Sequence, residues 1–550
     1  MALKNDAARG LALAVALVLL GGAPSSGRSL PQTRAESSGY AATSRYVDVI
    51  RFIRDLQRLS PHIRVETLGR SVEGRDIPLL VIGDPVPASP SCLKADGRMA
   101  VYIQANIHAG EVEGKEASLM LARDVLLDPK TAYLDQLIIL IAPILNADGN
   151  ERISPKNRSG QRGPEEGVGL RHNGQNLDLN RDCMKLETPE IRGMVDNVLV
   201  RWDPLVMVDC HTTNGAFHEE TVTWSWPLNP NADRPILLYQ RDKMLPAVNR
   251  IMKEKYGTRG LPYGVFRDWK NPESGWETFD SRPRYVTNYV GLRNRISLLD
   301  ENDVHADFKT RVSGNYGFLR AVLDYCRSHR EEITRLAGEA DANAVRRGLN
   351  PGEADVFAVE VDVRALPEPV TIHGYVTEVV SREGGFPELK RTDEKRTYTV
   401  PYYADFVPKR TVRLPFAYLI PEAGDSVRDN LRRHGIAVEE LVESAELEVE
   451  GFLLSELAAE DRLYQGHRLN RVKGEYNLEK KMFASGALVV RLAQPLGSLA
   501  ASLLEPESDD GLLAWNFFDR YLAAQWSRRL SVYPVYRLLA PALLVTDSLP

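Results

Sequence analysis

Two histidines and a glutamate in this sequence have the residue types and spacing that metal-assisted hydrolysis requires. His108 and Glu111 lie three residues apart in a turn that leads into a helix-like pattern, so their side chains can converge on one point. His211 comes much later in the chain, which suits a ligand supplied by another strand. Two imidazoles and one carboxylate are a typical catalytic zinc set, with the fourth tetrahedral position open to water.

Four short apolar segments have to position these residues, and polar side chains follow each of them. They are residues 99–107, 137–145, 205–209 and 296–300. Continuous apolar runs of this length are typical of strands buried on both faces of a sheet. Residues 112–128 have apolar side chains at helical spacing. The alternation predicts an α/β fold with a mixed, largely parallel sheet flanked by helices. Ligands bind beyond the carboxyl ends of such strands, so one crevice can gather His108, His211 and Glu301.

The remaining chain suggests a second domain. Residues 45–60 have the apolar spacing of an amphipathic helix, and residues 28–42, rich in Ser, Gly and Arg, indicate a linker. Gly and Pro near residues 345–355 suggest a boundary, and several later runs alternate with period two, with one helical patch at 511–526. We predict a catalytic domain at 43–340 and a β-rich accessory domain of unknown role at 355–550.

The N-terminal segment has the features of a signal peptide. Lys4 and Arg9 precede ten apolar residues at 11–20, and small residues suited to cleavage follow. Ten residues rise about 15 Å as a helix, half of the hydrocarbon thickness of a bilayer. We therefore expect residues 1–27 to be removed and the mature protein to be secreted or periplasmic, with no stable membrane span. An uncleaved membrane tether is the alternative.

Composition and charge narrow the class of protein. Hydrophobic residues make up 43% and charged residues 26%, as in a soluble globular protein. The net charge is −6 without a long block of one sign, so no nucleic acid partner is expected. The spacing of the four cysteines fits no metal-binding motif. The sequence does not decide whether they form disulfides or are buried free thiols. Cys210 is expected to point away from its neighbour His211, because side chains alternate along a strand.

Five segments, in order, resemble the motifs of a known enzyme family. They are "NIHAGEVEGKE", "NADGNE", "NLDLNRD", "VDCHTTNG" and "LLDENDVHADFKTRV". Together they resemble the zinc metallocarboxypeptidases, the family of carboxypeptidase A, over residues 40–335. The ordered combination is far more specific than any one motif.

The resemblance implies a metal site and a catalytic base. It implies that His108, Glu111 and His211 bind one zinc ion and that Glu301 is the general base. Zinc lowers the pKa of its bound water toward ~7, and a nearby carboxylate can take the proton as the water attacks a carbonyl. Asp303 is the nearest competing acid.

Three further residues match positions that bind substrate or support the metal site in this family. Asn180 and Arg181 match the pair that holds the terminal carboxylate of the substrate, which an arginine fork binds through two parallel hydrogen bonds. Asp178 matches the acid that orients the first zinc histidine.

The sequence departs from the family pattern at two functional positions. The simplest alignment puts Pro155 where carboxypeptidase A has the arginine that stabilises the oxyanion. Four arginines compete to replace it, namely Arg152, Arg158, Arg162 and Arg171. The mobile tyrosine of the family has two candidates, Tyr285 and Tyr289.

The expected function is that of a secreted zinc-dependent metallocarboxypeptidase, which hydrolyses the C-terminal peptide bond of peptides or proteins. One alternative is a zinc amidohydrolase of the aspartoacylase type, which shares the metal site but acts on small N-acyl amino acids. The other is a catalytically impaired, peptide-binding relative.

Overall fold

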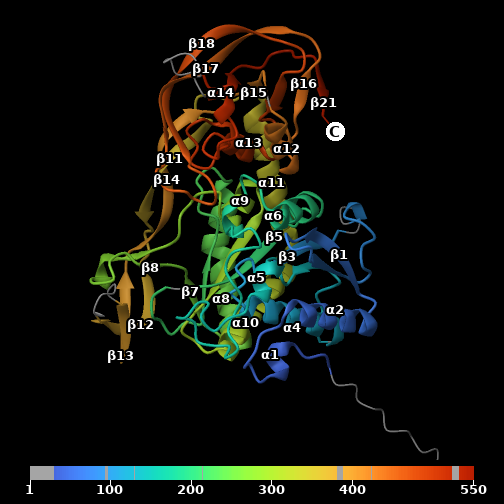
Figure 1. The fold of residues 1–550 in the computed structure, drawn as a ribbon, viewed down its shortest axis with the longest axis vertical. Coiled ribbons are helices and arrows are strands. Elements are labelled where there is room, and N and C mark those ends of the chain that lie inside the picture. The colour runs from blue at the N-terminus through green and yellow to red at the C-terminus, as the bar shows by residue number, and fades with distance from the viewer. Residues whose placement is uncertain are drawn as a thin grey trace, which may run out of the picture. The chain divides into compact units, whose positions relative to one another are not determined.

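The strands expected from the sequence form part of a mixed β-sheet (Figure 1). The computed structural model describes residues 30–92, 97–128, 130–213, 215–380, 388–422, 424–522 and 532–549. Within these ranges the sheet order is β1-β2-β4-β3-β5-β10-β6-β7. Its strands are β1 Ile63–Arg70, β2 Asp76–Ile82, β3 Met99–Ala105, β4 Leu137–Ala142, β5 Val206–Thr212, β6 Val222–Ser225, β7 Gly260–Pro262 and β10 Ile296–Asn302.

The four central strands, β4-β3-β5-β10, are parallel, and antiparallel pairs lie toward both edges. Every residue of β3, β4 and β5 is buried, as the continuous apolar runs predicted. The predicted mixed, largely parallel sheet is confirmed. The strand ends differ from the prediction, since β5 continues to Thr212 and β10 to Asn302. His211 and Glu301 therefore lie within strands instead of following them.

Helices cover both faces of this sheet (Figure 1). Helices α2, α4, α8 and α10 pack on one face, while α6 and α9 pack on the other. The helices predicted at residues 45–60 and 112–128 are confirmed as α2 and α4. No helix of the described ranges combines the length and apolar character needed to cross a membrane. The bounds are α2 Tyr46–Leu59, α4 Glu113–Leu127, α5 Ala147–Glu151, α6 Pro189–Met194, α7 Arg234–Leu238, α8 Leu245–Tyr256, α9 Val286–Leu292, α10 Phe308–Ser328 and α11 Arg330–Leu349.

The segment expected as a linker is packed where it is described. Helix α1, Arg34–Ser37, begins with a capping box at Thr33, and Ala35 and Ala42 are fully buried. The adjacent Thr43 hydroxyl donates to Glu116 Oε1 at 2.8 Å. Residues 33–42 are thus anchored by a helix cap and by small buried apolar side chains, which the polar composition of the segment did not predict. The expected signal peptide, residues 1–27, lies outside the described residues.

The second half of the chain is rich in strands, as predicted. Its largest sheet in the described ranges has the order β18-β17-β20-β15-β19-β16-β21, and β12 pairs with β13. A further sheet, β11-β14-β9-β8, joins two of its strands to β8 and β9 of the first half. The bounds are β8 Val265–Phe266, β9 Trp276–Glu277, β11 Val356–Ala365, β12 Val370–Val380, β13 Glu388–Val400, β14 Tyr402–Arg413, β15 Ala417–Ile420, β16 Glu439–Leu441, β17 Ala445–Ala459, β18 Asn470–Phe483, β19 Leu488–Arg491, β20 Tyr536–Leu538, β21 Thr546–Ser548, α12 Asp425–Arg433, α13 Gly497–Leu504 and α14 Asp519–Leu522.

The helix predicted at residues 511–526 is wrong for residues 511–518. That stretch forms consecutive turns, and α14 begins only at Asp519. Leu512, Leu513, Trp515 and Phe518 are nevertheless buried. Their apolar spacing thus reflects burial from several sides. In so short a stretch, this pattern cannot be distinguished from that of a helix.

The change from helix to strand falls at the expected boundary, since α11 ends at Leu349 and β11 begins at Val356. The chain nevertheless forms one compact unit from Gln32 to Pro550. One hydrophobic cluster combines Leu179 and Tyr289 with Leu499 and Trp515 from the second half. The division into domains at 43–340 and 355–550 stays a prediction.

Candidate metal centre and active site

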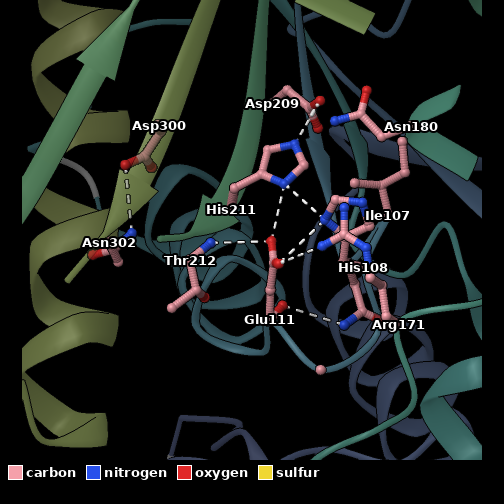
Figure 2. A network of polar contacts seen from close by, with 12 residues as sticks. Ile107, His108, Glu111, Arg171, Asn180, Asp209, His211, Thr212, Asp300 and Asn302 are labelled. Atoms are coloured by element: carbon pink, nitrogen blue, oxygen red, sulfur yellow. Dashed lines mark hydrogen bonds and ion pairs between the residues drawn. The ribbon is translucent and has the colours of Figure 1, made fainter. Parts of the chain in front are cut away.

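His108, Glu111 and His211 point toward one another at the carboxyl end of the central strands (Figure 2). His211 Nδ1 lies 3.2 Å from His108 Nδ1 and 2.9 Å from Glu111 Oε2. His108 Nδ1 lies 3.2 Å from Glu111 Oε1. All three residues are at most 3% exposed, and their ligand atoms lie within 4.8 Å of one another. One metal ion could therefore reach an atom of each.

Close packing of helix α4 against the sheet holds two of these residues in place. The backbone N–H of Glu111 donates to the His108 carbonyl oxygen at 2.9 Å, closing the turn between β3 and α4. At Gly114 a Cβ atom would lie 2.5 Å from Cys210 Cβ, so only glycine permits this approach of helix and strand. Cys210 thus faces α4, and its neighbour His211 faces the site, as predicted from strand alternation.

A carboxylate holds the far nitrogen of each histidine. His108 Nε2 lies 3.0 Å from Asp178 Oδ1, and His211 Nε2 lies 2.9 Å from Asp209 Oδ2. Such contacts fix the ring so that Nδ1 faces the shared point. Asp178 was a sequence candidate, whereas Asp209 was missed. Its signal was present, because residues two apart on a strand share a face.

Neighbouring positive groups keep the buried carboxylates of the site ionised. Burial by itself raises the pKa of Glu111, but His108 and Arg158 hold the pKa of that carboxyl well below its ordinary value. Burial likewise opposes ionisation of Asp178, yet His108 and two arginines hold the pKa of Asp178 well below its usual range. The site thus keeps ionised carboxylates beside two imidazoles. This buried set of two nitrogen ligands and one oxygen ligand fits zinc.

Glu301 lies beside the histidines on the neighbouring strand. It pairs with His211 in the parallel register of β10 and β5. Burial raises the pKa of Glu301 to about 8, against the opposing effect of His211. The competing acid Asp303 does not line the cavity within the described residues, and its Oδ1 instead accepts from the backbone N–H of His305 at 3.0 Å.

A cavity of about 240 Å³ opens onto these side chains. Arg181 lies in its wall with its guanidinium 4.2 Å from the ring centroid of Tyr285. The side chain of Asn180 is fixed, since its Oδ1 accepts from the backbone N–H of Val286 at 2.9 Å. The lining residues are His108, Glu111, Arg171, Asn180, Arg181, His211, Thr212, Thr213, Tyr263, Phe279, Tyr285, Thr287, Leu299 and Glu301.

Among the described residues, Arg171 is the one of the four candidate arginines that lines the cavity. Its Nε donates to Asp178 Oδ2 at 2.9 Å. Arg158 lies behind Glu111, where it donates to Glu111 Oε1 at 2.8 Å and to the carbonyl oxygen of Thr212 at 2.9 Å. Arg152 pairs with Glu73 at 2.7 Å, and Arg162 does not reach the cavity.

Of the two candidate tyrosines, one lines the cavity and the other is buried away from it. Tyr285 lines the cavity, whereas Tyr289 is fully buried and its hydroxyl donates to His434 Nδ1 at 2.7 Å. Tyr263, which was not anticipated, also lines the cavity, and burial raises the pKa of its hydroxyl well above the ordinary value.

Part of the chain matches a known protein family. Residues 49–204 match the zinc carboxypeptidase family. The chain is 23% identical to "Carboxypeptidase 2" of Trichophyton rubrum, over 92% of this chain and 88% of that protein. It is 30% identical to "Carboxypeptidase D" of Rattus norvegicus, over 29% of this chain and 11% of that protein.

Solved structures show a weaker likeness. A metallo-carboxypeptidase from Pseudomonas aeruginosa, in complex with (2-guanidinoethylmercapto)succinic acid, has 18% sequence identity and a TM-score of 0.39. The match covers 53% of this chain and 70% of that one.

Proposed function

We propose that this chain, which belongs to the zinc carboxypeptidase family, removes residues from the C-terminus of peptides at the cavity beside His108, Glu111 and His211. The observation that supports the proposal best is a juxtaposition. A buried His–Glu–His set and the Asn180–Arg181 pair line the same cavity. A metal site next to a fixed guanidinium suits an amide bond one residue away from a free carboxylate.

The chemistry of the cut divides between a metal and the chain's own residues. A zinc ion held by His108, Glu111 and His211 would supply a Lewis acid that polarises a carbonyl and lowers the pKa of water. Glu301 takes the proton of the attacking water and gives it to the leaving amine.

The arginines of the cavity have two tasks in this proposal. Arg181, stacked on Tyr285, binds the terminal carboxylate, while Asn180 donates to it through its amide nitrogen. Arg171 is held by Asp178 at the cavity wall and stabilises the negative charge that develops on the carbonyl oxygen. Arg171 thus takes the role for which the family's alignment offered only Pro155.

The test is a digest of a mixed peptide pool by the zinc-loaded protein, followed by mass spectrometry. A ladder of peptides shortened from the C-terminus is expected. Glu301→Gln should keep the zinc and lower kcat about 10²- to 10⁴-fold, because the proton acceptor is lost. Asp303→Asn is the matched control and should keep activity. Cleavage of acetyl amino acids without any peptide ladder would instead support an aspartoacylase-type amidohydrolase.

Export belongs to the same proposal. Lys4, Arg9 and the apolar residues 11–20 support removal of residues 1–27 during secretion. N-terminal sequencing of the mature protein from the culture medium or periplasm tests this, and an intact Met1 in the cell fraction would contradict it.

A further inference from the structure

A tight turn from the second half of the chain contacts Asp178, the residue that orients the metal-site residue His108. It lies between β17 and β18, which run side by side as a long hairpin (Figure 1). The backbone N–H of Tyr464 donates to the His467 carbonyl oxygen at 2.8 Å, and His467 N–H donates back at 3.0 Å. Gln465 and Gly466 therefore form the two-residue tip.

The tip contacts the residue that orients His108. Gln465 Oε1 accepts from the backbone N–H of Asp178 at 2.8 Å. The Asp178 carboxylate in turn lies 3.0 Å from His108 Nε2 and accepts from Arg171 Nε at 2.9 Å. Asp178 is only 5% exposed, so little water is available to replace the amide oxygen of Gln465.

The backbone of Gln465 is unfavourable for its residue type. Its φ is 51° and that of Gly466 is 83°, both in the left-handed region. Two-residue turns of this kind favour Asn, Asp or Gly at the first position, because other side chains crowd the backbone there. A glutamine at this position is explained by the reach of its side chain, since asparagine is one methylene shorter.

Both flanks of the turn are anchored to the first half of the chain. His467 Nε2 lies 2.7 Å from Glu187 Oε1, and the guanidinium of Arg284 lies 4.9 Å from the ring centroid of Tyr464. Arg284 is itself held by Asp510, whose Oδ1 accepts from Arg284 Nε at 2.8 Å. The tip is thus fixed in direction and cannot swing away without breaking these contacts.

We propose that Gln465 is a positioning residue for the metal site, through which the strand-rich second half of the chain holds the Asp178–Arg181 segment against His108. The inference rests on the proposed function only in taking His108 as a metal ligand. It gives the second half of the chain a definite task, which is to complete the active site.

The test compares Gln465→Met, which keeps the side-chain length but loses the acceptor, with Gln465→Gly, which also relieves the backbone. Leu463→Ala is the matched control, since Leu463 lies in the same connection and is 72% exposed. Zinc affinity is measured by competition with a chelator. Hydrogen exchange of peptides covering residues 176–182 is measured on the metal-free protein, and urea unfolding gives the stability.

Both Gln465 variants should bind zinc about 3- to 10-fold more weakly, less than the 10- to 100-fold typical of a direct partner of a ligand. Exchange at residues 176–182 should be faster, and Gln465→Gly should be more stable than Gln465→Met, because only glycine relieves the backbone of the turn. Wild-type zinc affinity and exchange in both variants would overturn the inference, as would losses that merely follow a fall in stability. If the variants weaken zinc binding although the wild-type protein cleaves no peptide, the inference stands and the proposed function fails.

Discussion

At the scale of the residue, the orientation of two imidazole rings decides whether a metal can bind. His108 and His211 turn their Nδ1 atoms to one point because Asp178 and Asp209 hold the opposite nitrogens. The two carboxylates are 5% and 0% exposed, so water cannot take over this task readily. The affinity for zinc therefore depends on residues that never touch the ion.

Asp209→Asn tests this dependence. Gln104 Nε2 donates to Asp209 Oδ1 at 3.0 Å while His211 faces Oδ2, so the aspartate accepts on both sides. An asparagine has one acceptor and one donor, and one of the two contacts becomes repulsive in either orientation. We expect zinc affinity to fall about 10- to 100-fold in chelator competition. Asp242→Asn, at an exposed position, is the control, and equal affinities in the two variants would contradict the prediction.

At the scale of the element, the contact between α4 and β5 places Glu111 beside His211. Gly114 lies in the first turn of α4, directly against Cys210 of β5. The helix begins only two residues after Glu111, so any displacement of its first turn is passed to the ligand.

Gly114→Ala should destabilise the protein although alanine favours helix. Alanine gains about 1 kcal/mol of helix propensity, but its Cβ would lie 2.5 Å from Cys210 Cβ, and overpacking a core costs about 1–3 kcal/mol. A net loss of about 1 kcal/mol in urea unfolding is expected. Gly338→Ala in α11 is the matched control, because nothing lies within 4 Å of its Cβ, and it should be stabilising. An increase in stability for Gly114→Ala would show that the helix can move.

The same elements show what sequence reasoning can reach. The fully apolar runs of β3 and β4 predicted the sheet, and the polar residues after them predicted a site at its carboxyl edge. The ends of β5 and β10 were missed because His211 and Glu301 continue the ladder although they are polar. Arg171 could not be distinguished by sequence from the other three candidate arginines, because its position depends on how the loop before Asp178 folds. The contact of Gln465 spans almost 300 residues and leaves no local pattern.

At the scale of the whole molecule, the two halves of the chain meet at a buried polar junction. His434, which follows α12, is fully buried between residues of the first half. Its Nδ1 accepts from the Tyr289 hydroxyl at 2.7 Å, and its Nε2 lies 3.2 Å from the Met184 carbonyl oxygen. Arg293 donates to the His434 carbonyl oxygen at 2.7 Å and brings a positive charge to the same place. The junction therefore requires a neutral imidazole.

This requirement makes the assembled protein sensitive to acid. Burial, reinforced by Arg293, lowers the pKa of His434 from the ordinary 6.5 to about 3. Below pH 6.5 His434 becomes protonated in the unfolded chain but stays neutral in the folded chain. The free energy of unfolding therefore decreases as the pH is lowered from 6.5 to about 3. The loss approaches about 1.4 kcal/mol per pH unit well below pH 6.5, which gives about 2.3 kcal/mol between pH 6.5 and 4.5. His434→Gln should be less stable at pH 8 but should lose less stability on acidification, as measured by urea unfolding at each pH. Parallel curves for His434→Gln and the wild-type protein would show that the junction does not titrate.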